Sequence, residues 1–120
     1  MIYSTDVKNR RLQVIIDAIG EDGLLKIGTT GMERTLSVVR LQTPAFRAPV
    51  DGVMELNGSM NLDTNARGTG KARVAQITTA SGKIIIDDMT VGKDGVLELV
   101  SDDIQQGQEV RIVSGAIAHA

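Results

Sequence analysis

The first segment of the chain carries apolar residues at the spacing of an α-helix. These positions follow i, i+3, i+4 and i+7 and would lie on one helical face: Leu12, Ile15, Ile16 and Ile19. Ser4 or Thr5 can cap the helix, Asp6 sits in the first turn where the helix dipole favours a negative charge, and Gly20 can end it. The pattern predicts a helix over residues 5–19. Because so short a helix is unstable alone, its apolar stripe must pack on the rest of the chain or on another subunit.

After Gly23 the apolar period changes from that of a helix to that of a strand. Alternating or β-branched runs separated by Gly, Asn and Ser turns occur at 25–27, 36–41, 53–56, 60–62, 72–77, 83–87, 96–100 and 109–117. About eight short strands with frequent turns predict a mainly β fold, an antiparallel β-sandwich or jelly roll over residues 24–118. We find no linker, so residues 1–120 are expected to form a single domain.

Two segments depart from this strand-and-turn pattern. Residues 42–49 contain Pro44 and Pro49 and predict an extended excursion, because each proline fixes its own φ and biases the preceding residue toward β. Such an excursion could be a binding arm. Residues 63–70 form a polar, glycine-containing loop that could be mobile until a partner docks on it. For both segments the alternative is an ordinary surface loop.

Composition argues against catalysis and against several kinds of ligand. The chain has no Cys and no Trp, and only one His, one Phe and one Tyr, so the residues that most often carry nucleophilic, metal and base-stacking chemistry are nearly absent. We therefore expect a protein that is not an enzyme and that uses no cofactor and no metal. The net charge of −2 does not predict a nucleic-acid partner. No apolar run is long enough to cross a membrane, and the first residues lack the features of an export signal.

Two ligand motifs come close in sequence but fail on spacing. The stretch 68–71 ends in Gly-Lys like a phosphate-binding loop, but Asn65 stands where that motif needs glycine and Ala72 where it needs Ser or Thr. A calcium loop starting at residue 63 would need oxygen ligands where Arg67 and Val74 stand. Neither site is predicted.

Three stretches together resemble the small structural virion proteins of tailed bacteriophages and prophages: Met1–Ile19, Leu25–Met32 and Ile104–Ala120. The resemblance implies a location in the virion after synthesis in the host cytoplasm. It also implies a capsid cement (decoration) protein, which would bind and stabilise the lattice of the major capsid protein. Two alternatives remain, a structural protein of the neck, tail or baseplate and a non-catalytic β-sandwich module that binds carbohydrate.

A cement protein acts by contact, so the candidate site is a set of partner-contacting residues. The expected partners are the major capsid protein or another virion protein and further copies of this chain, without nucleic acid or membrane. The candidate contacts are Met1, Ile2, Tyr3, Pro44, Phe46, Arg47, Pro49, Asn65 and Arg67. We expect Phe46 to be an exposed apolar anchor, so that a charged residue in its place would abolish particle binding and leave the fold intact.

Overall fold

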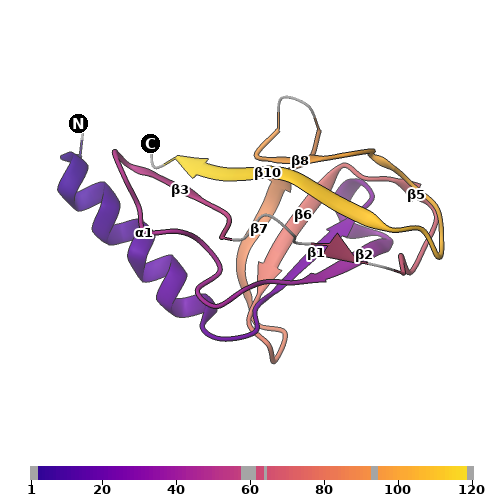
Figure 1. Ribbon diagram of the computed structural model, residues 1–120, viewed down its shortest axis with the longest axis horizontal. Coiled ribbons are helices and arrows are strands. Elements are labelled where there is room, and N and C mark those ends of the chain that lie inside the picture. Colours follow the sequence, from indigo (N-terminus) through magenta and orange to yellow (C-terminus); the bar gives the residue numbers. More distant parts are fainter. Residues whose placement is uncertain (1–2, 58–61, 64, 93–94, 119–120) are drawn as a thin grey trace.

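The computed structural model describes residues 3–57, 62–63, 65–92 and 95–118 (Figure 1). The chain is mainly β, with one N-terminal helix, as the sequence pattern predicts. Helix α1 spans Thr5–Ile19, and a short 3-10 turn spans Thr30–Met32. The strands are β1 Leu24–Gly28, β2 Thr35–Arg40, β3 Val53–Glu55, β4 Leu62–Asp63, β5 Gly70–Lys71, β6 Val74–Thr78, β7 Ile84–Thr90, β8 Leu97–Leu99, β9 Asp103–Ile104 and β10 Val110–Ala118.

Helix α1 has the predicted bounds and the predicted caps. The Ser4 hydroxyl oxygen accepts a hydrogen bond from the backbone N–H of Val7 at 3.3 Å. At the other end, Gly20 adopts a φ of 70° and donates its N–H to the carbonyl of Ile16. The apolar stripe is buried through Leu12, Ile16 and Ile19, so the helix packs on its own chain. Within the described ranges, no helix has the length and hydropathy needed to span a bilayer.

The first sheet is antiparallel and has the strand order β2-β1-β6-β7. Its centre is a row of fully buried side chains, because Leu25 of β1 lies opposite Val39 of β2 on one side and Ile77 of β6 on the other. Burying such aliphatic side chains supplies the main stabilisation of the sheet, at about 1.5 to 3 kcal/mol each.

The second sheet is built around the long strand β10. Strands β3, β4 and β8 all pair antiparallel with it, and β5 and β9 form a small separate ladder. Buried side chains of both larger sheets and of α1 belong to one apolar core. The molecule is elongated, 43 × 27 × 25 Å, and α1 lies at one end of the long axis (Figure 1).

Most predicted strands are confirmed within one or two residues, and the differences have local causes. The run predicted at 72–77 begins as a strand only at Val74, and the run at 83–87 extends to Thr90. Strands β5 and β9 are two residues long and therefore carry no alternation that a sequence pattern could reveal. Of the strand predicted at 60–62, residues 60 and 61 lie outside the described residues.

Phe46 is not the exposed anchor that the sequence suggested. Its side chain is only 1% exposed and belongs to the apolar core, and its backbone forms an antiparallel bridge with Leu56. The expectation was wrong because the flanking prolines indicate an excursion of the backbone, whereas burial of a large aromatic surface is strongly favourable wherever a cavity in the core can accept it. Phe46 therefore cannot contact a partner directly.

Because Phe46 is buried, a substitution there should destabilise the fold, whereas the sequence-based expectation was that the fold would stay intact. Phe46→Ala should lower the free energy of unfolding by about 3 to 5 kcal/mol, because it removes a buried ring and leaves a cavity. The neighbouring Arg47→Ala, at an exposed position, is the matched control and should change stability by about 0.5 kcal/mol or less. Urea unfolding of the two variants checks this, and equal stabilities would show that the ring is not part of the core.

Candidate partner-binding surface

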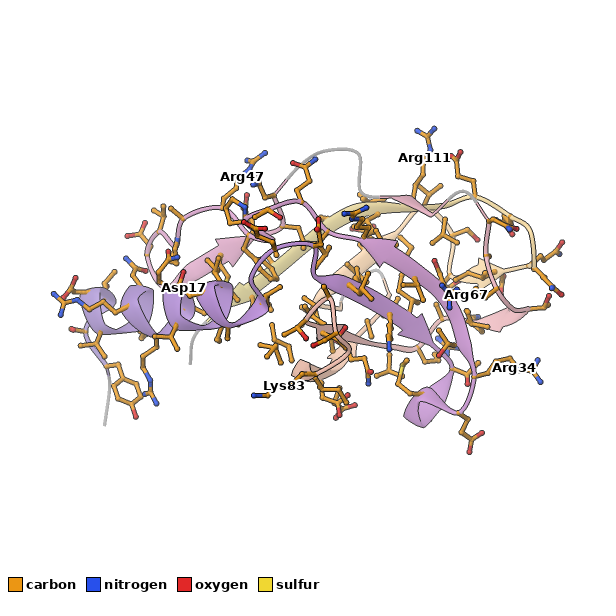
Figure 2. The ribbon with its side chains drawn as sticks, turned by 90° about the horizontal axis from the view of Figure 1, so that it is seen from below. Asp17, Arg34, Arg47, Arg67, Lys83 and Arg111 are labelled. Atoms are coloured by element: carbon orange, nitrogen blue, oxygen red, sulfur yellow. The ribbon has the colours of Figure 1, made fainter. Side chains whose placement is uncertain are left out.

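Residues 42–52, here called the platform loop, present the most prominent of the predicted contact residues. Pro44 and Arg47 are exposed, and Pro49 is half-buried. Val50, which the sequence did not single out, is an aliphatic side chain left 65% exposed. Figure 2 shows the Arg47 side chain pointing away from the body of the molecule. The loop thus combines apolar and cationic groups on one exposed segment.

Backbone hydrogen bonds fix the platform loop to residues 55–57 of the same chain. The N–H of Arg47 donates to the carbonyl of Glu55 at 2.7 Å, and the N–H of Asn57 donates to the carbonyl of Ala45 at 2.9 Å. The side-chain amide of Asn57 also donates to the carbonyl of Pro44 at 3.0 Å. With Phe46 buried beneath, these contacts make the segment an ordered surface and not the free arm that the two prolines suggested.

A tight turn closes the platform loop and ties it to α1. Val50 and Val53 exchange two backbone hydrogen bonds across Asp51 and Gly52, whose φ values are 52° and 75°. Positive φ at both central residues defines a type I′ hairpin, for which Asp-Gly is a preferred pair. The N–H of Gly52 donates to the side-chain oxygen of Asn9 in α1 at 2.8 Å. The Asp-Gly pair is a sequence signal that could have predicted this hairpin.

The predicted N-terminal contacts are only partly described. Met1 and Ile2 lie outside the described residues. Tyr3 is half-buried, and the guanidinium of Arg11 lies 4.6 Å from the centre of its ring, within cation–π range. Because Asn9 joins α1 to the platform loop, Tyr3 belongs to the same end of the molecule as that loop.

Asn65 and Arg67 are exposed, as predicted, but lie in a different part of the molecule. Figure 2 shows Arg67 well separated from Arg47 along the long axis. Backbone hydrogen bonds hold the described part of their loop in place. The N–H of Arg67 donates to the carbonyl of Leu36 in β2 at 2.8 Å, and the N–H of Ala66 donates to the carbonyl of Gln108 at 2.9 Å. The structure therefore divides the predicted contacts between two regions, the platform loop and the loop that contains Asn65 and Arg67.

One hollow of the described surface is lined by residues of β9, of β10 and of the segment between β8 and β9. This shallow hollow of about 250 Å³ lies beside Val100, and its two charged lining residues, Glu109 and Arg111, form an ion pair with each other. Among the described residues, no group of three or more carboxylate or imidazole side chains could hold a metal ion.

Comparison of the chain with known protein families, with curated proteins and with solved structures finds no match. The fold and the surface define a mainly β domain with one helix and an ordered, exposed loop.

The link between α1 and the platform loop can be tested at Asn9. Asn9→Ala should lower the free energy of unfolding by about 1 kcal/mol, because it leaves the N–H of the buried Gly52 without its acceptor. Hydrogen exchange at the Gly52 amide should accelerate. Asn9→Asp keeps a side-chain oxygen and is the matched control, which should retain protection at Gly52. If Asn9→Ala alters neither stability nor exchange, this hydrogen bond does not hold the loop.

Proposed function

We propose that this chain is a structural virion protein, a capsid cement protein that binds the major capsid protein lattice through the platform loop. Two lines support the proposal. One is the resemblance of residues 1–19, 25–32 and 104–120 to small virion proteins of tailed phages. The other is the ordered platform loop, which supplies a contact surface of the kind such a protein needs.

The observation that carries the proposal is the contrast between the two sides of the platform loop. Phe46 is buried on the inner side, while Pro44, Arg47 and Val50 are exposed on the outer side. A loop already held in one conformation loses little conformational entropy when it docks, so most of its contact energy contributes to affinity. We expect the partner to present an apolar patch for Val50 beside a carboxylate that competes for Arg47 with the exposed Glu55, which lies 4.0 Å from the Arg47 guanidinium.

Binding of this kind stabilises a capsid by mass action. A protein that binds the assembled lattice and not the free subunits shifts the equilibrium toward the assembled state, as any ligand favours the state that it prefers. Each contact can be weak, because many copies on one lattice act together through their high local concentration. This mechanism requires no reacting group.

The arrangement of the aromatic residues weighs against the carbohydrate-binding alternative. Sugar sites use exposed aromatic rings as flat platforms, and the chain has one Phe and one Tyr and no Trp. Phe46 is buried, and Tyr3 already stacks with Arg11. A neck, tail or baseplate protein would use the same kind of contact surface, and labelling of intact virions for electron microscopy distinguishes it from a cement protein.

The proposal predicts a specific loss of capsid binding. Arg47→Glu combined with Val50→Asp should lower the affinity for purified empty capsids by at least about tenfold, because it reverses the charge and removes the apolar contact at the centre of the platform loop. Co-sedimentation with capsids built from the major capsid protein of the same phage measures this. Both side chains are exposed, so the melting temperature should stay within a few degrees of the unmodified protein.

Arg34→Glu is the matched control, since it also reverses an exposed arginine but lies far from Arg47 (Figure 2). It should bind capsids as the unmodified protein does. Equal capsid occupancy by the platform variant and the unmodified protein would contradict the proposal, and so would an equal loss in the control.

A further inference from the structure

Helix α1 carries a second stripe of residues, on the side that faces away from the molecule. These residues follow the spacing of neighbours on one helical face and are here called the outer stripe: Val7, Arg11, Val14 and Ala18. All four are exposed, Val7 by 39% and Val14 by 66%. A β-branched side chain in water favours neither burial nor the helix itself. The stability of α1 therefore does not account for valine at these positions.

The outer side of α1 is regular and accessible. The helix is one uninterrupted segment of 15 residues, and it packs on β3 and β7 through its buried stripe. Figure 1 shows α1 as the outermost element at its end of the molecule. Polar contacts beside the outer stripe run along the helix, since Arg10 pairs with Asp6 at 3.1 Å and the Gln13 side chain donates to Asp17 at 3.0 Å. A partner helix could therefore lie along this side.

The charges of α1 fit a second copy of the same helix in the antiparallel direction. After Asp6 in the first turn, the next charged residues are all basic: Lys8, Arg10 and Arg11. The last turn contains Asp17 and no basic residue. A helix dipole favours cations at this end, so the dipole of α1 does not explain the position of Asp17. An antiparallel second copy would place its basic half and the positive end of its dipole beside Asp17.

One register of such a pair brings the outer stripes together. With the two-fold axis between residues 12 and 13, Val7 of each copy lies opposite Ala18 of the other, and Arg11 lies opposite Val14. The small Ala18 leaves room for a close approach of the two helices. The guanidinium of Arg11 stacks on the ring of Tyr3 at 4.6 Å, so it is held toward the N-terminus of its own helix and its aliphatic stem is left to face Val14.

The same register brings opposite charges together at the side of the outer stripe. Arg10 and Asp17 are seven residues apart, which is about two helical turns, so both lie on one flank of the stripe. In a two-fold antiparallel pair each flank meets the same flank of the other copy, so Arg10 approaches Asp17 of the other copy twice. The Arg10 side chain is 80% exposed. Its several N–H donors can serve Asp6 and the second carboxylate together.

We propose that two copies of this chain form a dimer through antiparallel packing of their α1 helices, outer stripe against outer stripe. A two-fold contact of this kind uses the same surface on both copies and closes the assembly at a dimer. The contact is limited to about four turns of helix, which is small beside a standard protein–protein interface. The dimer is therefore weak, and its formation depends on concentration and on salt.

This inference goes beyond the proposed function and does not depend on it. The platform loop is joined to α1 through Asn9, which lies on a different side of the helix from the outer stripe. A dimer would therefore keep two accessible platform loops and could engage two capsid subunits at once. The tests below use no capsids. Failure of dimer formation leaves the capsid proposal standing, and failure of capsid binding leaves the dimer standing.

Charge reversal tests the direction and register of the pairing. Sedimentation equilibrium of the unmodified protein should show a mass that rises with concentration from 12.8 kDa toward twice that value. Arg10→Glu and Asp17→Arg should each weaken the dimer by about tenfold, because the two-fold symmetry makes like charges face each other at two places. The double variant Arg10→Glu, Asp17→Arg should restore it. A protein that stays monomeric at millimolar concentration would overturn the proposal, and so would a dimer that ignores Arg10→Glu or a folded double variant that stays monomeric.

The apolar contact gives a second test that does not rely on Arg10 or Asp17. Val14→Glu should weaken the dimer by at least about tenfold, because it places a carboxylate in the centre of the contact on both copies. Val113→Glu is the matched control, since Val113 is also an exposed valine, 56% accessible, but lies on β10. It should dimerise as the unmodified protein does. Circular dichroism of both variants should show that the fold is kept. A dimer that persists in Val14→Glu, or an equal loss in the control, would contradict pairing through α1.

Discussion

The packing of the single phenylalanine ring determines the surface on which the proposed binding depends. Phe46 sits in a segment bounded by two prolines, and on sequence grounds that segment could have been a free arm. Because the ring is buried in the core and its backbone bridges to Leu56, the residues on either side must lie against the sandwich. Pro44 and Arg47 are thereby displayed in fixed positions, so the burial of one apolar ring positions the exposed apolar and cationic groups of the platform loop.

The helix and the platform loop form one unit because of a second constraint, the type I′ turn at Asp51 and Gly52. That turn directs the N–H of Gly52 toward Asn9 of α1. The apolar stripe of α1 packs into the same core as Phe46. A substitution that weakens the packing of either α1 or the Phe46 ring is therefore expected to disturb the exposed residues of the platform loop.

The elements that depend on local pattern could be predicted from the sequence, and those that depend on long-range packing could not. The helix over residues 5–19 was predicted with its caps because Ser4, Gly20 and the apolar spacing all act within a few residues. The burial of Phe46 depends on Leu56 and on the core, which no local pattern encodes. The Asp51-Gly52 turn lies between these cases, since the dipeptide predicts the hairpin but not the hydrogen bond to Asn9.

The proposed contact surface for the capsid lies on the platform loop. The claim beneath the proposed function is that the platform loop is ordered before any partner binds. Hydrogen exchange of the free protein tests this most directly at the amides of Arg47, Val53 and Asn57, which donate to backbone carbonyls. The account predicts protection there comparable with that of the central strand β1. Exchange at the rate of an unstructured peptide would contradict it, because the loop would then be a free arm.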